Sequence, residues 1–157
     1  MSNQTFAPLD IVPFWARMND TVVQLVDYIP EDKLNWSPKP ELWNFKGIFI
    51  HVCGARHNWL ANVIKDGEST PEVLREGQTR DGLKEQLRVS WERTARFLSD
   101  PAKLGATYRG VHPDNEPYSL SGYWIAYHLL EHDIHHRSDI FHYLALLGIE
   151  HPEVGTP

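Results

Sequence analysis

The chain has 157 residues, of which 41% are hydrophobic, a size at which a single domain can bury a substantial core. It carries one cysteine, 15 lysines and arginines against 21 acidic residues, and a formal net charge of −6. This composition excludes an intramolecular disulfide framework, argues against nucleic acid as a partner, and offers no apolar run near the roughly 20 residues of a membrane span. We expect one domain over residues 1–157 in the cytoplasm, since the N-terminus also lacks the pattern of a secretion signal.

The first predicted helix runs from about Asp10 to Tyr28, with Pro13 tolerated in its first turn. Its apolar side is expected to hold Phe14, Met18, Val22, Leu25 and Val26. The following joint, residues 31–43, contains two prolines together with Leu34, Trp36 and Trp43. Its apolar side chains predict a long ordered strap that packs on the helices.

The second predicted helix begins with Asn44 as its N-cap and ends near Lys65. Its expected apolar face consists of Ile48, His51, Val52, Ala55, Trp59 and Val63. Residues 66–79 are predicted to form a loop, with a short helical turn near residues 72–75. A third, ordinarily amphipathic helix is predicted from Arg80 to Leu98.

Residues 100–120 contain three prolines and two glycines, a composition typical of a long functional or lid-like connection. Tyr108, His112 and Tyr118 are candidates for shaping a pocket mouth, although a variable surface would show the same pattern. A fourth helix is predicted from the cap Ser121 to Leu147, ending at Gly148. Four helices of such lengths predict an all-α fold, an antiparallel four-helix bundle with the strap between its first two helices.

The most informative feature of the chain is the placement of histidines among core positions. The apolar stripe of the fourth helix reads Ile125, Leu129, His132, His136, Ile140, Tyr143, Leu147. His51 occupies a similar position on the second helix. Burying a neutral imidazole without a partner costs on the order of 1–3 kcal/mol, so these rings need partners. Each could bond to a backbone carbonyl or a buried water, or the three could share one metal ion.

Other residues on the two helices of these three histidines could support the site or lie outside it. Asp139 could hydrogen-bond a ligand histidine or accept a proton, or it could be a solvated carboxylate. His128 and His135 project from the flank of the stripe, where structural or supporting roles are expected. His57 points away from the proposed site and His142 lies at the edge of its helix, whereas Cys53 is expected to be a packed or surface thiol outside the site.

These residues also carry a resemblance to a known family. The segment from His132 to Asp139, His-Asp-Ile-His-His-Arg-Ser-Asp, resembles the H-x-x-x-H-R-G-Q signature in the final helix of the DinB-like (YfiT-like) metalloenzymes. The strap around Trp36 and Pro38, the upstream His51 and the Leu-Leu-Gly ending at Gly148 extend the similarity over nearly the whole chain.

The resemblance implies a four-helix bundle, commonly a homodimer, in which His51, His132 and His136 bind a divalent metal ion. Zinc, nickel, iron and manganese all accept imidazole, with zinc or nickel as our first expectation. Ser138 and Asp139 replace the Gly and Gln of the signature. The additional carboxylate could tighten metal binding, act as a base or orient an imidazole.

Two classes of function are compatible with this pattern. The first is a metal-dependent enzyme that activates water for hydrolysis or a low-molecular-weight thiol for transfer to a small-molecule substrate, and we favour the thiol. The second is a non-catalytic, metal-stabilised bundle that acts as a binding or interaction module, in which removal of the metal would unfold the domain.

Overall fold

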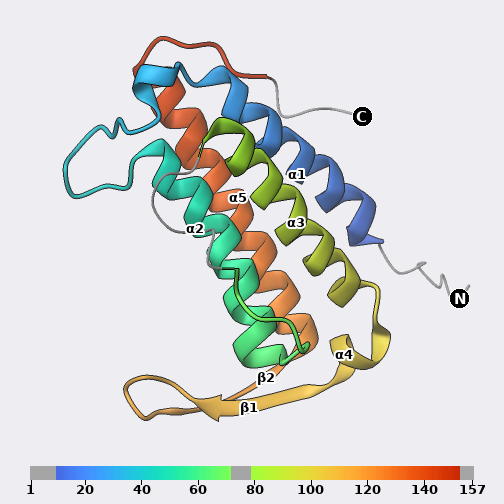
Figure 1. Cartoon of the computed structure of the whole chain (residues 1–157). Helices are drawn as coiled ribbons and strands as arrows, with labels where there is room; N and C mark the ends of the chain where they lie inside the picture. Colours follow the sequence, from blue (N-terminus) through green and yellow to red (C-terminus); the bar gives the residue numbers. More distant parts are fainter. Residues whose placement is uncertain (1–9, 72–78, 153–157) are drawn as a thin grey trace, which may run out of the picture.

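The computed structural model describes residues 10–71 and 79–152, and this part of the chain is mostly helical. The elements in chain order are α1 (Ile11–Tyr28), η1 (Glu31–Lys33), α2 (Phe45–Asn58), η2 (Trp59–Ile64), α3 (Arg80–Leu98), α4 (Pro101–Gly105), β1 (Thr107–Val111), β2 (Pro117–Ser121) and α5 (Gly122–Leu146). The four long helices lie side by side (Figure 1), and α3 contacts α1 and α2 while α5 contacts α2 and α1. Among the described residues, no helix is both long enough and apolar enough to cross a membrane.

The ends of the long helices follow the capping residues in the sequence. Asn44 accepts a hydrogen bond from the backbone N–H of Gly47, and Ser121 accepts one from that of Trp124, so both predicted N-caps are confirmed. At the other end of α5 the chain turns at Gly148, whose φ of +68° is a conformation that glycine adopts without a steric penalty. These local bonds set where α5, which carries two of the three proposed ligands, begins and ends.

The second helix changes its winding before it ends. After Asn58 the chain continues as the π-helical segment η2, and it leaves the helix at Lys65, which has a left-handed φ of +56°. The predicted end of this helix near Lys65 is therefore confirmed. Leu60 and Ile64, both within this π-helical segment, are buried in the core.

The buried side of α1 differs from the prediction at one position. Met18, Val22, Leu25 and Val26 are buried as expected, but Phe14 is 51% exposed, so its predicted place on the apolar side is wrong. Trp15 is completely buried in its place. The two residues are neighbours in the sequence, so a rotation of α1 about its axis exposes Phe14 and buries Trp15. The Trp15 indole donates a hydrogen bond to buried Asp133 at 2.8 Å, and this bond favours the observed rotation.

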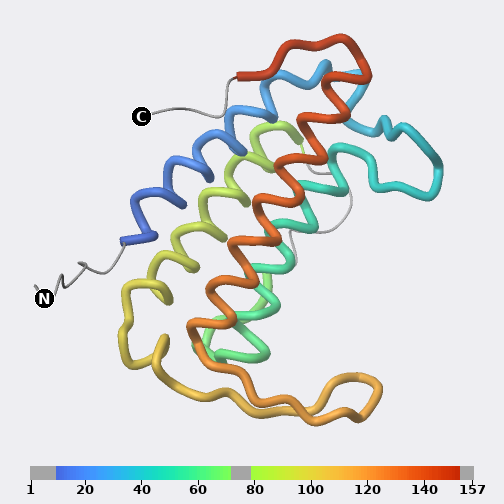
Figure 2. The backbone as a smooth tube through the Cα atoms, turned by 180° about the vertical axis from the view of Figure 1, so that it is seen from behind, coloured from blue at the N-terminus to red at the C-terminus, as the bar shows by residue number. Residues whose placement is uncertain are grey.

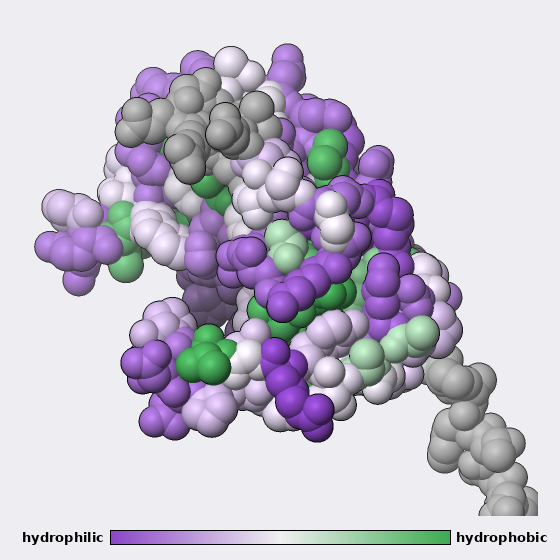
Figure 3. All heavy atoms as spheres, turned by 60° about the horizontal axis from the view of Figure 1, so that its bottom comes forward, coloured by the Kyte–Doolittle hydropathy of each residue, from purple (hydrophilic) through white to green (hydrophobic). Residues whose placement is uncertain are grey.

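The long, lid-like connection predicted over residues 100–120 contains regular secondary structure that the prediction did not include. Asp100 caps the short helix α4, and β1 and β2 pair as an antiparallel hairpin in which Thr107 lies opposite Ser121. The turn is closed by the His112 N–H, which donates to the Glu116 carbonyl, and by Asn115 with a φ of +66°. The hairpin projects from one end of the helices, and the surface seen from this side is mostly hydrophilic with separate small apolar patches (Figure 3).

The connection between α1 and α2 lies at the end of the helices opposite the hairpin (Figure 2). Leu34 of this connection is buried. The backbone of the connection is hydrogen-bonded to the start of α2, because the Lys46 N–H donates to the Leu34 carbonyl and the Phe45 N–H donates to the Trp36 carbonyl. Trp43, at the end of the connection, stays 49% exposed. The helical turn expected near residues 72–75 lies outside the described residues.

Candidate metal centre

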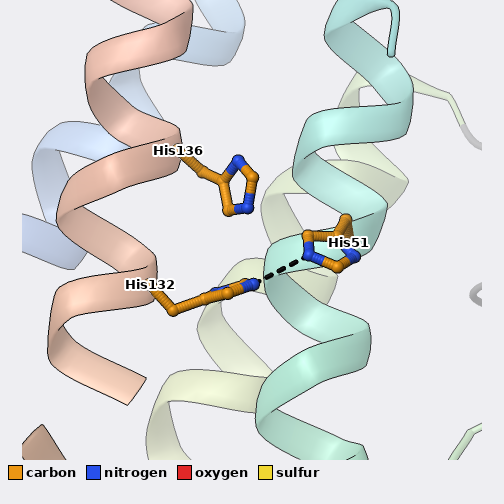
Figure 4. A group of neighbouring side chains, drawn as sticks. All are labelled: His51, His132 and His136. Carbon is orange, nitrogen blue, oxygen red and sulfur yellow. Dashed lines mark hydrogen bonds between the residues drawn. The ribbon is translucent and has the colours of Figure 1, made fainter. Parts of the chain in front are cut away.

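The three histidines singled out in the sequence come together in space. His51 lies on α2, while His132 and His136 lie one turn apart on α5, and their rings point toward one another (Figure 4). One nitrogen from each ring lies within 4.8 Å of the others, and the Nε2 atoms of His51 and His132 are 2.8 Å apart. Nitrogens that share one zinc ion at 2.0–2.1 Å are about 3–3.5 Å apart, so the observed spacing fits such an ion after small side-chain adjustments. We call these three residues the histidine triad.

The histidine triad is less deeply buried than the sequence predicted. Only His136 is buried, at 8% exposed, whereas His51 and His132 are half-buried. The predicted deep core position of His51 is therefore wrong, because the fully buried face of α2 is the neighbouring one that carries Phe45, Phe49 and Val52. A half-buried position suits a reactive site, since a ligand can reach the ring nitrogens from outside.

Asp139 fixes the orientation of His136. The Nδ1 of His136 donates a hydrogen bond to the Asp139 carboxylate at 3.0 Å. A carboxylate can only accept such a bond, so the proton of the neutral ring resides on Nδ1 and the Nε2 lone pair is free for a metal. His135 approaches the same carboxylate at 3.6 Å but is an exposed side chain. His135, His136 and Asp139 form a second group that could hold an ion, and in this group Asp139 Oδ2 already accepts the hydrogen bond from His136.

The surroundings keep two members of the triad neutral. Burial, followed by the neighbouring His132 and His136, lowers the pKa of His51 from 6.5 to about 4. Burial and His132 also lower the pKa of His136, against an opposing effect of Asp139. Neutral imidazole is the form that binds metal ions, so at neutral pH these rings are ready to act as ligands.

Two pockets border the triad. The first, which we call the acidic pocket, has a volume of about 340 Å³ and is lined by Glu41, Leu42, Trp43, Ile48, His135, His136, Asp139 and Tyr143. The second, which we call the aromatic pocket, has a volume of about 420 Å³ and is lined by His51, Gly54, Ala55, Asn58, Trp59, His128 and His132. Trp43 covers the triad on one side, with its ring centroid 3.9 Å from that of His51. The triad is therefore accessible from two directions.

The sequence analysis missed a buried ion pair directly behind the triad. Asp133 and Arg56 are both completely withdrawn from solvent, and the Arg56 Nη2 donates to the Asp133 Oδ2 at 2.7 Å. The same arginine donates to Asn19 on α1 and to Ser90 on α3. A signal was present, because Asp133 is placed between Leu129 and Ile140 at the helical spacing of core residues. We call Arg56, Asp133 and their hydrogen-bond partners Trp15, Asn19 and Ser90 the Arg56–Asp133 network.

The remaining histidines and Cys53 have other surroundings. His57 is buried on the opposite side of α2, where it accepts a hydrogen bond from Arg93, while His142 is exposed. His128 stacks on Trp124 beside the aromatic pocket. Cys53 is a packed and not a surface thiol, and burial raises its pKa to about 11. The hairpin residues considered as a pocket mouth, Tyr108, His112 and Tyr118, do not line the acidic or the aromatic pocket.

Comparison with known proteins identifies the family of the chain and proteins of similar fold. The DinB family model matches residues 1–157. A crystal structure of the DinB-like protein YjoA from Bacillus subtilis has a TM-score of 0.68 and 21% sequence identity, covering 94% of this chain and 96% of that one. A putative DinB family member from Exiguobacterium sibiricum also has a TM-score of 0.68, with 16% identity over 96% of this chain and 98% of its own. No curated protein matches the chain.

Proposed function

Because the chain belongs to the DinB family, we propose that its histidine triad binds one divalent cation and that the protein is a metal-dependent enzyme. The observation that carries the proposal is the convergence of His51, His132 and His136, two of them with lowered pKa values, at a point reached from two pockets. In this proposal the four long helices are the antiparallel bundle expected from the sequence, and residues 31–43 are its strap. The bundle holds the ligands of α2 and α5 at a constant separation.

Three imidazole ligands leave coordination positions free for a reactant, which is the arrangement of catalytic sites and not of closed structural ones. Zinc or nickel is the first expectation, and iron and manganese also accept this donor set. The chemistry that such a cation supplies is the activation of water or a thiol as a nucleophile at neutral pH. The protein itself supplies orientation, since Asp139 keeps the Nε2 of His136 free of a proton.

The presence of two pockets favours group transfer between two reactants over hydrolysis. A hydrolase needs room for one substrate and a water molecule, whereas a thiol transferase must hold a thiol and an acceptor on different sides of the activating centre. The thiol must come from a separate molecule, because the thiol of Cys53 is buried and its pKa is raised to about 11.

The two pockets also differ in charge. Glu41 and Asp139 line the acidic pocket, and neither a lysine nor an arginine is among its lining residues. The indole of Trp43 adds an aromatic face, which attracts a cation. We therefore propose that the reactant in the acidic pocket carries an ammonium group, and that the aromatic pocket accepts an uncharged, flat substituent against Trp59.

Elemental analysis of protein purified without a nickel column tests the metal site. We expect about one divalent ion per chain in the wild type, and loss of most of it in His51→Ala, His132→Ala and His136→Ala. His142→Ala is the matched control, because this exposed histidine of α5 lies away from the triad. Full metal content in the three triad variants, or equal loss in the control, would contradict the assignment.

A series of small thiols tests the class of reactant. Three small molecules share a thiol group and differ in the charge at the other end: cysteamine is positive, 2-mercaptoethanol is neutral and mercaptoacetate is negative. We expect all three to change the visible spectrum of the cobalt-loaded protein, with the tightest binding for cysteamine, and we expect Glu41→Gln to reduce that preference. Equal binding of the three thiols would contradict the proposed ammonium group but not the activation of a thiol. A spectrum that responds to none of the thiols would favour hydrolysis.

A further inference from the structure

Two buried polar atoms next to the triad have no hydrogen-bond partner among the described residues. They are the Nδ1 of His132 and the Oδ1 of Asp133, and they lie 3.9 Å apart. A buried polar atom without a partner costs free energy, so two such atoms facing each other need an explanation. The distance is longer than a hydrogen bond but short enough for one to form after a small rotation of the His132 ring.

The carboxylate of Asp133 is held in place by the Arg56–Asp133 network. Its Oδ2 accepts hydrogen bonds from the Trp15 indole at 2.8 Å and from Arg56 at 2.7 and 3.0 Å. Arg56 in turn donates to Asn19 at 2.9 Å and to Ser90 at 3.2 Å. Since groups on α1, α2 and α3 fix one oxygen, the other oxygen keeps its position beside His132.

The contact between His51 and His132 sets a condition for metal binding. Their Nε2 atoms are at hydrogen-bond distance, 2.8 Å, so one of these two atoms carries a proton when both rings are neutral. A nitrogen that binds a metal must have no proton. For His132 the proton then has to reside on Nδ1, the atom that faces Asp133.

We propose that Asp133 is a positioning residue, which accepts a hydrogen bond from Nδ1–H of His132 and so keeps its Nε2 free for the cation. The inference rests on the proposed function of the triad. When the His132 ring changes from the Nε2–H to the Nδ1–H tautomer, Nε2 releases a proton to water and Nδ1 takes one up from water. The ring therefore stays neutral. Asp139 already holds His136 in this way, and Asp133 does the same for His132 from the opposite, buried side.

The test uses variants that separate this role from the stabilising role of the ion pair. Replacing Asp133 alone would leave the Arg56 charge buried without a partner, and such a protein can fail to fold. The double variant Arg56→Met with Asp133→Leu removes both charges at similar volume. Ser90→Ala is the matched control, because it removes one hydrogen bond to Arg56 and leaves the carboxylate in place.

Two measurements test whether Asp133 positions His132. The first is the zinc dissociation constant from a competition titration, and the second is the tautomer of His132 from ¹⁵N NMR of the imidazole. We expect the double variant to fold, to bind zinc about 10–100-fold more weakly and to lose the Nδ1–H form of His132, whereas Ser90→Ala keeps the wild-type affinity and tautomer.

Wild-type zinc affinity in the folded double variant would overturn the inference and leave the triad intact. If the double variant does not fold, the metal-free wild type decides alone, because an Nε2–H tautomer of His132 there overturns the inference and an Nδ1–H tautomer supports it. A wild type that binds no zinc, cobalt or nickel would overturn the proposed function and this inference with it.

Discussion

At the scale of single residues, the protein depends on histidines that remain neutral inside the fold. His51 and His57 have pKa values lowered to about 4, mainly by burial, and that of His136 is lowered as well. His57 is held neutral for a structural reason, because its Nδ1 must accept a hydrogen bond from Arg93. In the triad, the same neutrality gives free lone pairs that a cation can use. Burial therefore keeps an acceptor nitrogen unprotonated on one side of α2 and the proposed metal-binding nitrogens unprotonated on the other.

These pKa values predict that the metal-free protein loses stability as the pH falls. Below pH 6.5 the unfolded chain protonates His51 and His57, while the folded protein does not do so until about pH 4. Protons therefore favour the unfolded state between these values. We expect the free energy of unfolding in urea to be constant above pH 7 and to decrease by about 1–3 kcal/mol between pH 6.5 and 4, allowing for the partial exposure of His51.

His57→Asn is the control for this titration. An asparagine oxygen can replace Nδ1 as the acceptor for Arg93, and it has no proton to gain in this range. We expect the variant to show a smaller decrease between pH 6.5 and 4 than the wild type. Stability that is constant, or that rises, as the pH falls through this window would contradict the assigned pKa values.

At the scale of secondary-structure elements, the joint between the hairpin and α5 determines where the helix with two triad histidines begins. The Gly122 N–H donates to the Ala106 carbonyl, and Ser121 caps the helix. A Cβ atom at position 122 would lie 2.2 Å from the Lys103 carbonyl oxygen and 2.7 Å from the Leu104 Cα. Those atoms belong to the backbone of α4, so they cannot move aside as a side chain would. The close contact explains glycine at this position.

Gly122→Ala is therefore expected to destabilise the protein by about 1–3 kcal/mol, although alanine is the better helix former. The matched control is Gly105→Ala, at the end of α4, because a Cβ atom there meets nothing within 4 Å. We expect the control to change stability by less than about 0.5 kcal/mol. Urea unfolding of both variants checks the prediction, and equal stability of the two would show that α4 is not packed against the start of α5.

At the scale of the whole molecule, the Arg56–Asp133 network joins all four long helices at one level. Its members come from α1 (Trp15, Asn19), α2 (Arg56), α3 (Ser90) and α5 (Asp133). Burying such a pair is costly, and its contribution to stability is smaller than its short distances suggest. The network also fixes the Asp133 carboxylate beside His132, with the Asp133 Oδ1 3.9 Å from the His132 Nδ1.

The sequence alone was sufficient for the properties that depend on neighbouring residues. Helix starts at Asp10, Asn44 and Ser121 follow from side chains that bond within the next turn, and the bounds of α3 follow from its apolar spacing. The selection of His51, His132 and His136 depended on the same spacing and on the family resemblance, and the structure brings them together. The hairpin was missed because its prolines and glycines are equally typical of an irregular loop.

Only the tertiary structure decided which faces are buried and which distant residues pair. It placed Trp15 and not Phe14 in the core, left His51 and His132 half-buried beside two pockets, and paired Arg56 with Asp133 across 77 positions of the chain. Helical periodicity gives the relative direction of side chains on one helix, but the rotation of each helix about its axis depends on every helix packed against it. A partner for a buried charge can come from any of those helices, and its identity is therefore settled only when they pack together.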